Sequence, residues 1–300
     1  MFGEFLEELK KKEIDISFSE GKIIYVGPEE NITPELIGKL KEFKDDLIKY
    51  YWPHESKNMM SIHPGGTKTS LIFIYCGSLS YFLSDYLGLN QPIYGFFDDG
   101  WLTGMKSVYS SVESIAKEYI NQLKKVLPNG PYVIGGHSFG GVIAYEMAVQ
   151  LQKSGHVVPF LSLFESMSPY ANVSLYRLNN ILHIYKNIFK PIVKKLWQFI
   201  KMPVFNIFFL INKSLPKPLR NYYIVTNYLM LLYKYRPGKF NGNVLLFKVD
   251  DDNYTFKYYY GWESLANKVK IIILEGDHLS MMTEKKYGEI IGKEIEKYLT

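Results

Sequence analysis

The sequence has almost no cysteine. Cys76 is the single cysteine among 300 residues, which excludes an intramolecular disulfide framework. No group of cysteine and histidine residues has the spacing of a zinc site, so we expect no metal centre. A chain without disulfides suits a reducing compartment, and we expect this protein to reside in the cytoplasm.

The sequence also lacks a long, uncharged hydrophobic run. Its first residues lead directly into a segment rich in lysine and glutamate, without the apolar stretch of a secretory signal. The most apolar segment, residues 196–211, contains Lys201 and Pro203 and is shorter than the roughly 18 to 20 residues that span a bilayer. We therefore expect no stable insertion into a membrane.

The basic residues do not form one continuous stripe. The chain has 35 Lys and Arg against 30 Asp and Glu, a net charge of +5, and its lysines are scattered among glutamates. Nucleic-acid binding usually needs a continuous basic patch, so we do not expect a nucleic acid as partner. An acidic protein partner is compatible with this balance. With 47% hydrophobic residues, the chain can bury a sizeable core.

Residues 1–52 have the pattern of a small separate unit. Apolar residues at helical spacing open it, and two alternating segments, 14–18 and 22–26, predict a β-hairpin. Thr33 is a good N-cap and Pro34 suits the first position of a following helix. The prediction is an α-β-β-α unit, joined by a polar linker at residues 53–62 to a larger domain.

Residues 63–300 alternate between strand and helix patterns. Short apolar runs suit buried parallel strands, and helical patterns at 112–127 and 141–151 separate several of them. This alternation predicts an α/β fold with a mostly parallel, doubly wound sheet. The six predicted strands are 71–75, 93–96, 132–135, 160–164, 244–247 and 269–274.

Residues 171–237 interrupt this alternation and predict an inserted helical lid. The segment is rich in lysine and aromatic residues, with helical stretches at 182–200 and 221–235. Its apolar side chains either form a core of their own or line a channel under the lid. The sequence leaves both readings open.

The sequence of residues 136–141, Gly-His-Ser-Phe-Gly-Gly, predicts a nucleophile elbow. It lies between a predicted strand and a predicted helix, where a serine is forced into a strained turn that projects its hydroxyl. The flanking glycines allow the backbone to pass closely. Ser138 is therefore the candidate nucleophile, whereas the neighbouring His137 is expected to have a structural role.

A serine needs a histidine base that a carboxylate orients, and the chain contains both in the order of the α/β-hydrolase fold. His278 follows the last predicted strand and a glycine turn, which makes it the candidate base. Glu165, at the end of the strand after the elbow helix, is the favoured acid. Asp250 or Asp251, after a later strand, is the alternative.

Backbone N–H groups should form the oxyanion hole of such a site. One donor is expected from Phe139, directly after the nucleophile. The other is expected from Cys76, in the turn after the first strand of the large domain. Cys76 has no elbow around it and is not expected to be a nucleophile.

Residues 63–299 resemble the thioesterase domains that end nonribosomal peptide and polyketide assembly lines. The resemblance implies an α/β-hydrolase fold and a serine thioesterase that releases an acyl or peptidyl chain, by hydrolysis or cyclisation, from the phosphopantetheine of a carrier protein. The enzyme would need no cofactor of its own. Glu165 stands where this family commonly has Asp. The segments that carry the resemblance are His-Pro-Gly-Gly at 63–66, 91–95, 129–132, the elbow, 144–148, Tyr-Arg-Pro at 235–237, 261–262 and Gly-Asp-His at 276–278.

Residues 1–52 resemble the TubC-type docking domains of assembly-line subunits, on the segments 20–25, 33–36 and 44–47. The resemblance implies recruitment by an upstream synthetase subunit. The alternatives are a type II thioesterase that clears mis-primed carriers, a non-catalytic docking adaptor and a membrane-associated lipase. The acyl group and the oligomeric state stay open.

Overall fold

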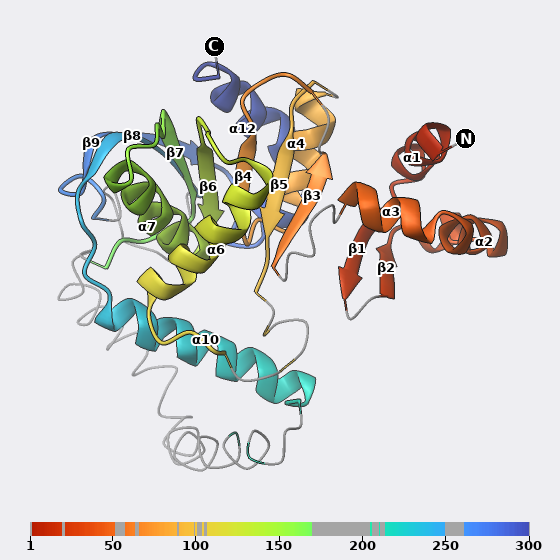
Figure 1. Ribbon diagram of the computed structural model, residues 1–300, viewed down its shortest axis with the longest axis horizontal. Helices are drawn as coiled ribbons and strands as arrows, with labels where there is room; N and C mark the ends of the chain where they lie inside the picture. The colour runs from red at the N-terminus through yellow and green to blue at the C-terminus, as the bar shows by residue number, and fades with distance from the viewer. Residues whose placement is uncertain are drawn as a thin grey trace.

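The computed structural model describes most of the chain. The described residues are 2–19, 22–51, 58–63, 66–88, 90–98, 100, 104, 107–169, 205, 210, 214–249 and 261–299. They form a small N-terminal unit and a larger α/β unit (Figure 1).

The N-terminal unit has the predicted α-β-β-α order, with a two-stranded antiparallel sheet. Thr33 caps its second helix by accepting a hydrogen bond from the backbone N–H of Leu36 at 3.2 Å. The single helix predicted after Thr33 is divided at Phe43, which ends the first part. The elements are α1 (Phe2–Lys11), β1 (Asp15–Ser19), β2 (Lys22–Val26), the 3₁₀ turn η1 (Glu29–Asn31), α2 (Pro34–Glu42) and α3 (Lys44–Tyr51).

A seven-stranded sheet forms the centre of the larger unit, in the order β3-β5-β4-β6-β7-β8-β9. All neighbouring strands are parallel except β3, which runs antiparallel to β5 at the edge. The predicted α/β fold with a mostly parallel sheet is confirmed. The strands are β3 (Met59–His63), β4 (Leu71–Ile74), β5 (Ile93–Phe96), β6 (Val133–His137), β7 (Phe160–Phe164), β8 (Phe240–Val249) and β9 (Ala266–Leu274).

The edge strand β3 changes the predicted boundary between the two units. Residues 53–62 were expected to form a linker, but residues 59–62 of that segment belong to β3. Met59 and Met60 are buried there, and the strand pairs with β5. The residues of β3 are a mixture of apolar and polar types, so the sequence does not predict a strand here. The segment is a strand because its backbone pairs with β5.

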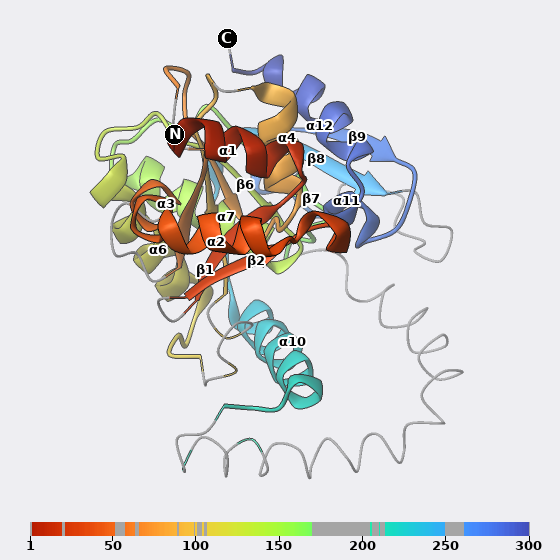
Figure 2. The ribbon, with the colours of Figure 1, turned by 90° about the vertical axis from the view of Figure 1, so that its right-hand side faces the viewer.

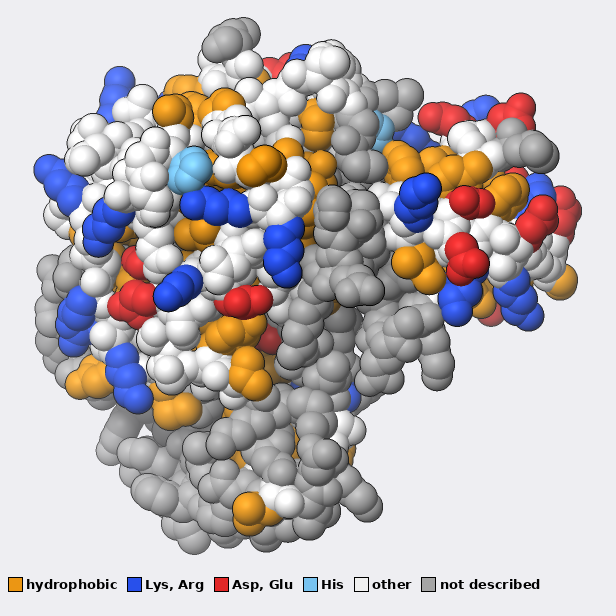
Figure 3. All heavy atoms as spheres, in the orientation of Figure 1, with side chains coloured by type: hydrophobic (Ala, Val, Ile, Leu, Met, Phe, Trp, Pro, Cys, Tyr) orange, Lys and Arg blue, Asp and Glu red, His pale blue; other side chains and the backbone are white. Residues whose placement is uncertain are grey.

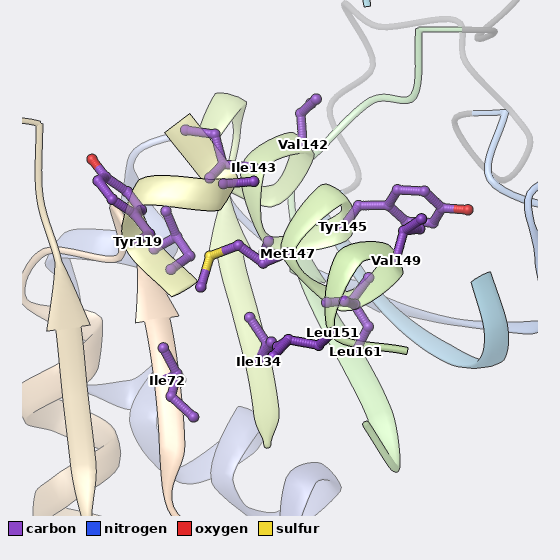
Figure 4. Packing of buried hydrophobic residues seen from close by; sticks show 14 of the residues in the cluster. Ile72, Tyr119, Ile134, Val142, Ile143, Tyr145, Met147, Val149, Leu151 and Leu161 are labelled. Carbon is purple, nitrogen blue, oxygen red and sulfur yellow. The ribbon is translucent and has the colours of Figure 1, made fainter. Parts of the chain in front are cut away.

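Helices cover both faces of the large sheet. The helices α6 and α7 pack on one face, and α4 and α12 pack on the other (Figure 1). Met147 and Leu151 of α7 lie over Ile134 of β6 (Figure 4). Full burial of one such side chain contributes about 1.5 to 3 kcal/mol. The helices are α4 (Leu79–Leu87), α6 (Val112–Val126), α7 (Phe139–Lys153), α10 (Lys217–Lys234), α11 (Ser280–Thr283) and α12 (Lys286–Glu296).

The helix α10 lies within the predicted insertion at residues 171–237. It corresponds to the helix predicted at residues 221–235 but begins four residues earlier. The helix predicted at 182–200 lies outside the described residues. None of the helices within the described ranges combines the length and the apolar character that crossing a membrane requires.

The two units touch through α1 and the hairpin on one side and α4 on the other (Figure 2). The Tyr81 hydroxyl donates a hydrogen bond to the carbonyl of Ile16 at 2.9 Å. Lys10 pairs with Asp85 at 3.2 Å, but both side chains are more than a third exposed, so the pair adds little stability. Acidic and basic side chains are interspersed over the face shown in Figure 3.

Candidate active site

Ser138 occupies a strained turn between β6 and α7. Its φ is 52° and its ψ is −121°, a region that residues with a side chain rarely adopt. A side chain on Gly136 would collide with the backbone of Gly140, and one on Gly140 would collide with Ile74 and with Tyr75. The glycines of the elbow are therefore required by backbone packing. The turn is fixed by a hydrogen bond from the Ser138 N–H to the Phe164 carbonyl at 2.9 Å.

Glu165 is the first residue after β7 and is held by the neighbouring strand β8. Its N–H donates to the Phe247 carbonyl at 2.8 Å, and its Oε1 accepts from the Val249 N–H at 2.7 Å. Its φ is 47°, so the chain turns sharply at this point. The carboxylate is only 9% exposed. These contacts fix the carboxylate at the end of the sheet, and Oε2 has a further partner.

His278 supplies that partner. Its Nδ1 lies 3.4 Å from Glu165 Oε2, and its side chain is 43% exposed. With Nδ1 directed at the carboxylate, Nε2 is the ring nitrogen that can accept a proton. The structure therefore brings together the favoured acid and the candidate base, which are 113 residues apart in the chain.

The loop that carries His278 is shaped by its own side chains. Asp277 Oδ1 accepts hydrogen bonds from the N–H groups of Ser280 at 2.9 Å and Leu279 at 2.8 Å. These two bonds lower the pKa of the Asp277 carboxyl. The Ser280 hydroxyl accepts from the Asp277 N–H at 2.8 Å. Sequence reasoning missed this role, although an Asp side chain that accepts the backbone N–H two residues on is a known turn pattern.

His137 connects the elbow to the candidate base. Its Nε2 lies 3.0 Å from the backbone carbonyl oxygen of His278, and the two rings are 4.6 Å apart. Burial, together with the neighbouring His278, lowers the pKa of His137 to about 4. His137 is therefore neutral near pH 7 and its Nε2–H can donate to that carbonyl. This arrangement agrees with the structural role expected for His137.

The turn after β4 lies next to the elbow. Tyr75 has a φ of 58°, and the close approach of Gly140 to Ile74 and Tyr75 brings the two turns together. Cys76 is 2% exposed, and burial raises the pKa of its thiol well above the usual value. The thiol is thus protonated and unsuited to be a nucleophile. The backbone roles of Phe139 and Cys76 in an oxyanion hole stay a prediction.

The alternative acids Asp250 and Asp251 lie outside the described residues. The carboxylate that the structure places against His278 is Glu165. Because Glu165 already receives the Val249 N–H, it is anchored at the end of the same strand that the two aspartates follow.

Several segments that the sequence analysis singled out form the support of the site. The ring of Tyr145 lies 4.7 Å from that of Trp262, whose indole N–H donates to the Ser166 carbonyl at 2.8 Å. The Tyr235 hydroxyl donates to Glu146 at 2.6 Å in a buried setting. These contacts tie the end of α10 and the residues after Glu165 to α7. Their function is to hold the scaffold.

Two protein families match the chain. Residues 101–188 match the thioesterase domain family, and residues 3–52 match the TubC N-terminal docking domain family. The first match spans the elbow and Glu165, and the second spans the N-terminal unit. Both matches agree with the two resemblances that the sequence analysis inferred.

Large synthetases are among the relatives of the chain. It is 26% identical over 254 residues to malpibaldin synthetase of Mortierella alpina. The aligned region covers 78% of this chain and 4% of the relative. It is 32% identical over 146 residues to malpinin synthetase of the same organism. This aligned region covers 48% of this chain and 2% of the relative. The chain therefore spans only a small part of these relatives.

The fold is also shared with a solved structure. The thioesterase domain of NocB, from the nocardicin cluster, superposes with a TM-score of 0.57 at 20% identity, covering 81% of this chain and 99% of that domain. At this identity the likeness concerns the fold. The predicted α/β-hydrolase fold is thereby confirmed.

Proposed function

We propose that this chain, a thioesterase domain behind a TubC-type docking domain, releases an acyl or peptidyl group from the phosphopantetheine arm of a carrier protein through an ester on Ser138. One observation carries the proposal. Ser138 stands in a strained strand-to-helix turn whose neighbour His137 contacts the backbone of His278, and His278 in turn faces Glu165. These contacts link the candidate nucleophile to the candidate base and acid through His137, which supports the proposal.

The reaction follows from the roles of these groups. His278 Nε2 accepts the hydroxyl proton of Ser138 while Oγ attacks the thioester carbonyl, and Glu165 stabilises the imidazolium that forms. The backbone N–H groups of Phe139 and Cys76 would stabilise the tetrahedral oxyanion. When the C–S bond breaks, the imidazolium returns its proton to the leaving thiolate.

The second half of the reaction uses the same groups in reverse. Water, or an amine or hydroxyl group of the bound chain, attacks the ester on Ser138 and gives its proton to His278. Attack by water releases a free acid, and attack by an internal group releases a ring. The proton then returns to Ser138 Oγ as the ester bond breaks.

The docking domain points to the partner. Residues 3–52 match a docking domain family, and the relatives of the chain are synthetases, so an upstream synthetase subunit is the proposed partner. Residues 1–52 would bring the thioesterase domain close to the carrier of that subunit. Recruitment raises the local concentration of the loaded carrier without requiring tight carrier binding at the active site.

Intact-mass spectrometry tests the proposal. The wild-type protein, Ser138→Ala and Ser154→Ala are each incubated with an acyl carrier protein loaded with a fatty acyl group. Ser154, at the opposite end of α7, is the matched control. We expect an acyl adduct or unloading of the carrier with wild type and with Ser154→Ala, and neither with Ser138→Ala. Equal behaviour of wild type and Ser138→Ala would favour a non-catalytic docking adaptor.

A further inference from the structure

Tyr228 of α10 lies against both turns of the candidate active site. Its ring stacks on that of Phe139, with centroids 4.2 Å apart and an angle of 15° between the planes. Its ring also stacks on that of Tyr75, with centroids 6.0 Å apart at 20°. Phe139 directly follows the candidate nucleophile, and Tyr75 directly precedes Cys76. One ring therefore contacts the neighbourhood of both expected oxyanion donors.

The hydroxyl of Tyr228 is anchored outside these two turns. It donates a hydrogen bond to Oδ2 of Asp98, in the segment after β5. Oδ1 of Asp98 accepts the N–H of Gly100 at 2.6 Å, so both carboxylate oxygens of Asp98 have defined donors. A hydrogen bond to a charged acceptor is stronger than one between neutral groups. The phenol is thus held at the ring and at the hydroxyl.

Tyr75 is held from its other side by α6. Its hydroxyl lies 3.0 Å from that of Tyr119, which donates to the Phe97 carbonyl at 3.2 Å. Phe97 is next to Asp98 in the chain, so the two anchors meet in the segment after β5. Tyr75, Tyr119 and Tyr228 consequently form a closed set of contacts around the turn that contains Cys76.

Further contacts fix α10 to the same segment. The Leu215 N–H donates to the Gly104 carbonyl at 2.9 Å, and the Tyr223 hydroxyl accepts from the Ser107 N–H at 3.3 Å. A side chain on Gly104 would collide with the guanidinium of Arg220. The position of Tyr228 therefore depends on how the whole of α10 packs against the segment after β5.

We propose that Tyr228 is a positioning residue that keeps the two oxyanion donors aligned, and that its bond to Asp98 couples this alignment to the seating of α10. The inference rests on the proposed function. The two donors belong to separate elements, the turn after β4 and the start of α7, and Tyr75 is at a positive φ that needs support from its surroundings. The stacked ring of Tyr228 restrains both elements together.

The consequence for the reaction is specific. Oxyanion donors act only when they lie within about 2.7 to 3.1 Å of the developing oxyanion. A small loss of alignment weakens stabilisation of the transition state more than binding of the ground state, so it lowers kcat and leaves KM nearly unchanged. Loss of folded enzyme, in contrast, lowers the number of active sites and leaves the rate per active site unchanged.

Four variants of the full chain test the inference. Tyr228→Phe removes the hydroxyl and keeps the ring, Tyr228→Leu removes the ring, and Asp98→Asn weakens the acceptor. Tyr233→Phe is the matched control, because Tyr233 is on the same helix and 74% exposed. Hydrolysis of an acyl N-acetylcysteamine thioester gives kcat and KM, and the end point of labelling with an alkyl fluorophosphonate counts the active sites of each variant.

We expect kcat per labelled site to fall roughly tenfold in Tyr228→Phe and in Asp98→Asn, the equivalent of one hydrogen bond to a charged group. In Tyr228→Leu it should fall further, with KM within about twofold of wild type throughout. The rate of labelling should fall in parallel, because the phosphonyl oxygen uses the same donors. Tyr233→Phe should match wild type.

Two results overturn the inference while the proposed function stands. One is an unchanged kcat per labelled site in Tyr228→Phe and Asp98→Asn alongside an active wild type. The other is a loss of activity that is fully accounted for by fewer labelled sites, which would make Tyr228 a folding residue only. A wild type that neither hydrolyses the thioester nor is labelled at Ser138 would refute the proposed function and this inference with it.

Discussion

Shortening Glu165 to aspartate should separate the acid from its histidine. In the structure, Glu165 Oε2 lies 3.4 Å from His278 Nδ1, already at the long end for a hydrogen bond, and Oε1 accepts the Val249 N–H at 2.7 Å. Removing one methylene withdraws the carboxylate by about 1.5 Å, one carbon–carbon bond. The contact with His278 then requires movement of the His278 loop, and the contact with Val249 requires movement of the Glu165 backbone.

The expected losses of activity differ between substitutions. Glu165→Gln keeps the shape and the contact with Val249 but cannot stabilise an imidazolium, and loss of the acid in serine triads costs about 10⁴ in kcat. His278 is 43% exposed, so water can replace part of this stabilisation, and we expect a loss of roughly 10³, or about 4 kcal/mol. Glu165→Asp should lose roughly 10 to 100-fold, because the charge is retained at a longer distance.

The assay measures hydrolysis of an acyl thioester at pH 7 to 8 by detecting the released thiol. Ser138→Ala gives the background rate. Glu263→Gln, which removes an exposed carboxylate near the same part of the fold, is the matched control and should retain full activity. The reasoning would be refuted if Glu165→Gln kept more than half of the wild-type kcat. Asp250→Asn and Asp251→Asn would then be tested as the alternative acid.

Two further predictions concern stability. His137 has a folded-state pKa of about 4 against about 6.5 when unfolded, so the unfolded chain binds more protons between these values and the free energy of unfolding should fall as pH drops from 6.5 to 4. Urea unfolding at pH 7 and pH 5 should show this loss in wild type and in a His156→Gln control but much less in His137→Gln; equal losses would contradict it. Tyr235→Phe removes the hydroxyl that donates to buried Glu146 at 2.6 Å, so it should lower the free energy of unfolding by about 1 to 3 kcal/mol. The control Tyr233→Phe should change this free energy little. An unchanged urea midpoint in Tyr235→Phe would show that the hydrogen bond adds no stability.

The sequence was informative wherever a local pattern determines local geometry. Glycines on both sides of Ser138 are required by backbone contacts, so the elbow could be recognised from its sequence together with the strand and helix predicted on either side. The apolar runs before Glu165 and His278 are parallel strands that end at the same edge of the sheet, which is why the two residues could be expected to meet. Periodicity and strand order were sufficient for that inference.

Contacts between distant elements could not be read from the sequence. The strand β3 exists because its backbone pairs with β5, and its side-chain pattern does not require a strand. The stacking of Tyr228 on Phe139 depends on how α10 is seated after an insertion. Its bond to Asp98 joins residues 130 positions apart in the chain. No local propensity encodes such contacts.

His137 and Ser138 are neighbours in the elbow, but their expected roles differ. Successive residues at the end of a strand point to opposite sides, so the turn that projects Ser138 directs His137 elsewhere, against the backbone of His278. Burial keeps His137 neutral, so in the proposed mechanism no second positive charge would form beside His278 when that residue accepts a proton. The candidate nucleophile and a support for the candidate base are thus positioned by one dipeptide, so a shift of the elbow would displace both ends of the proposed proton transfer together.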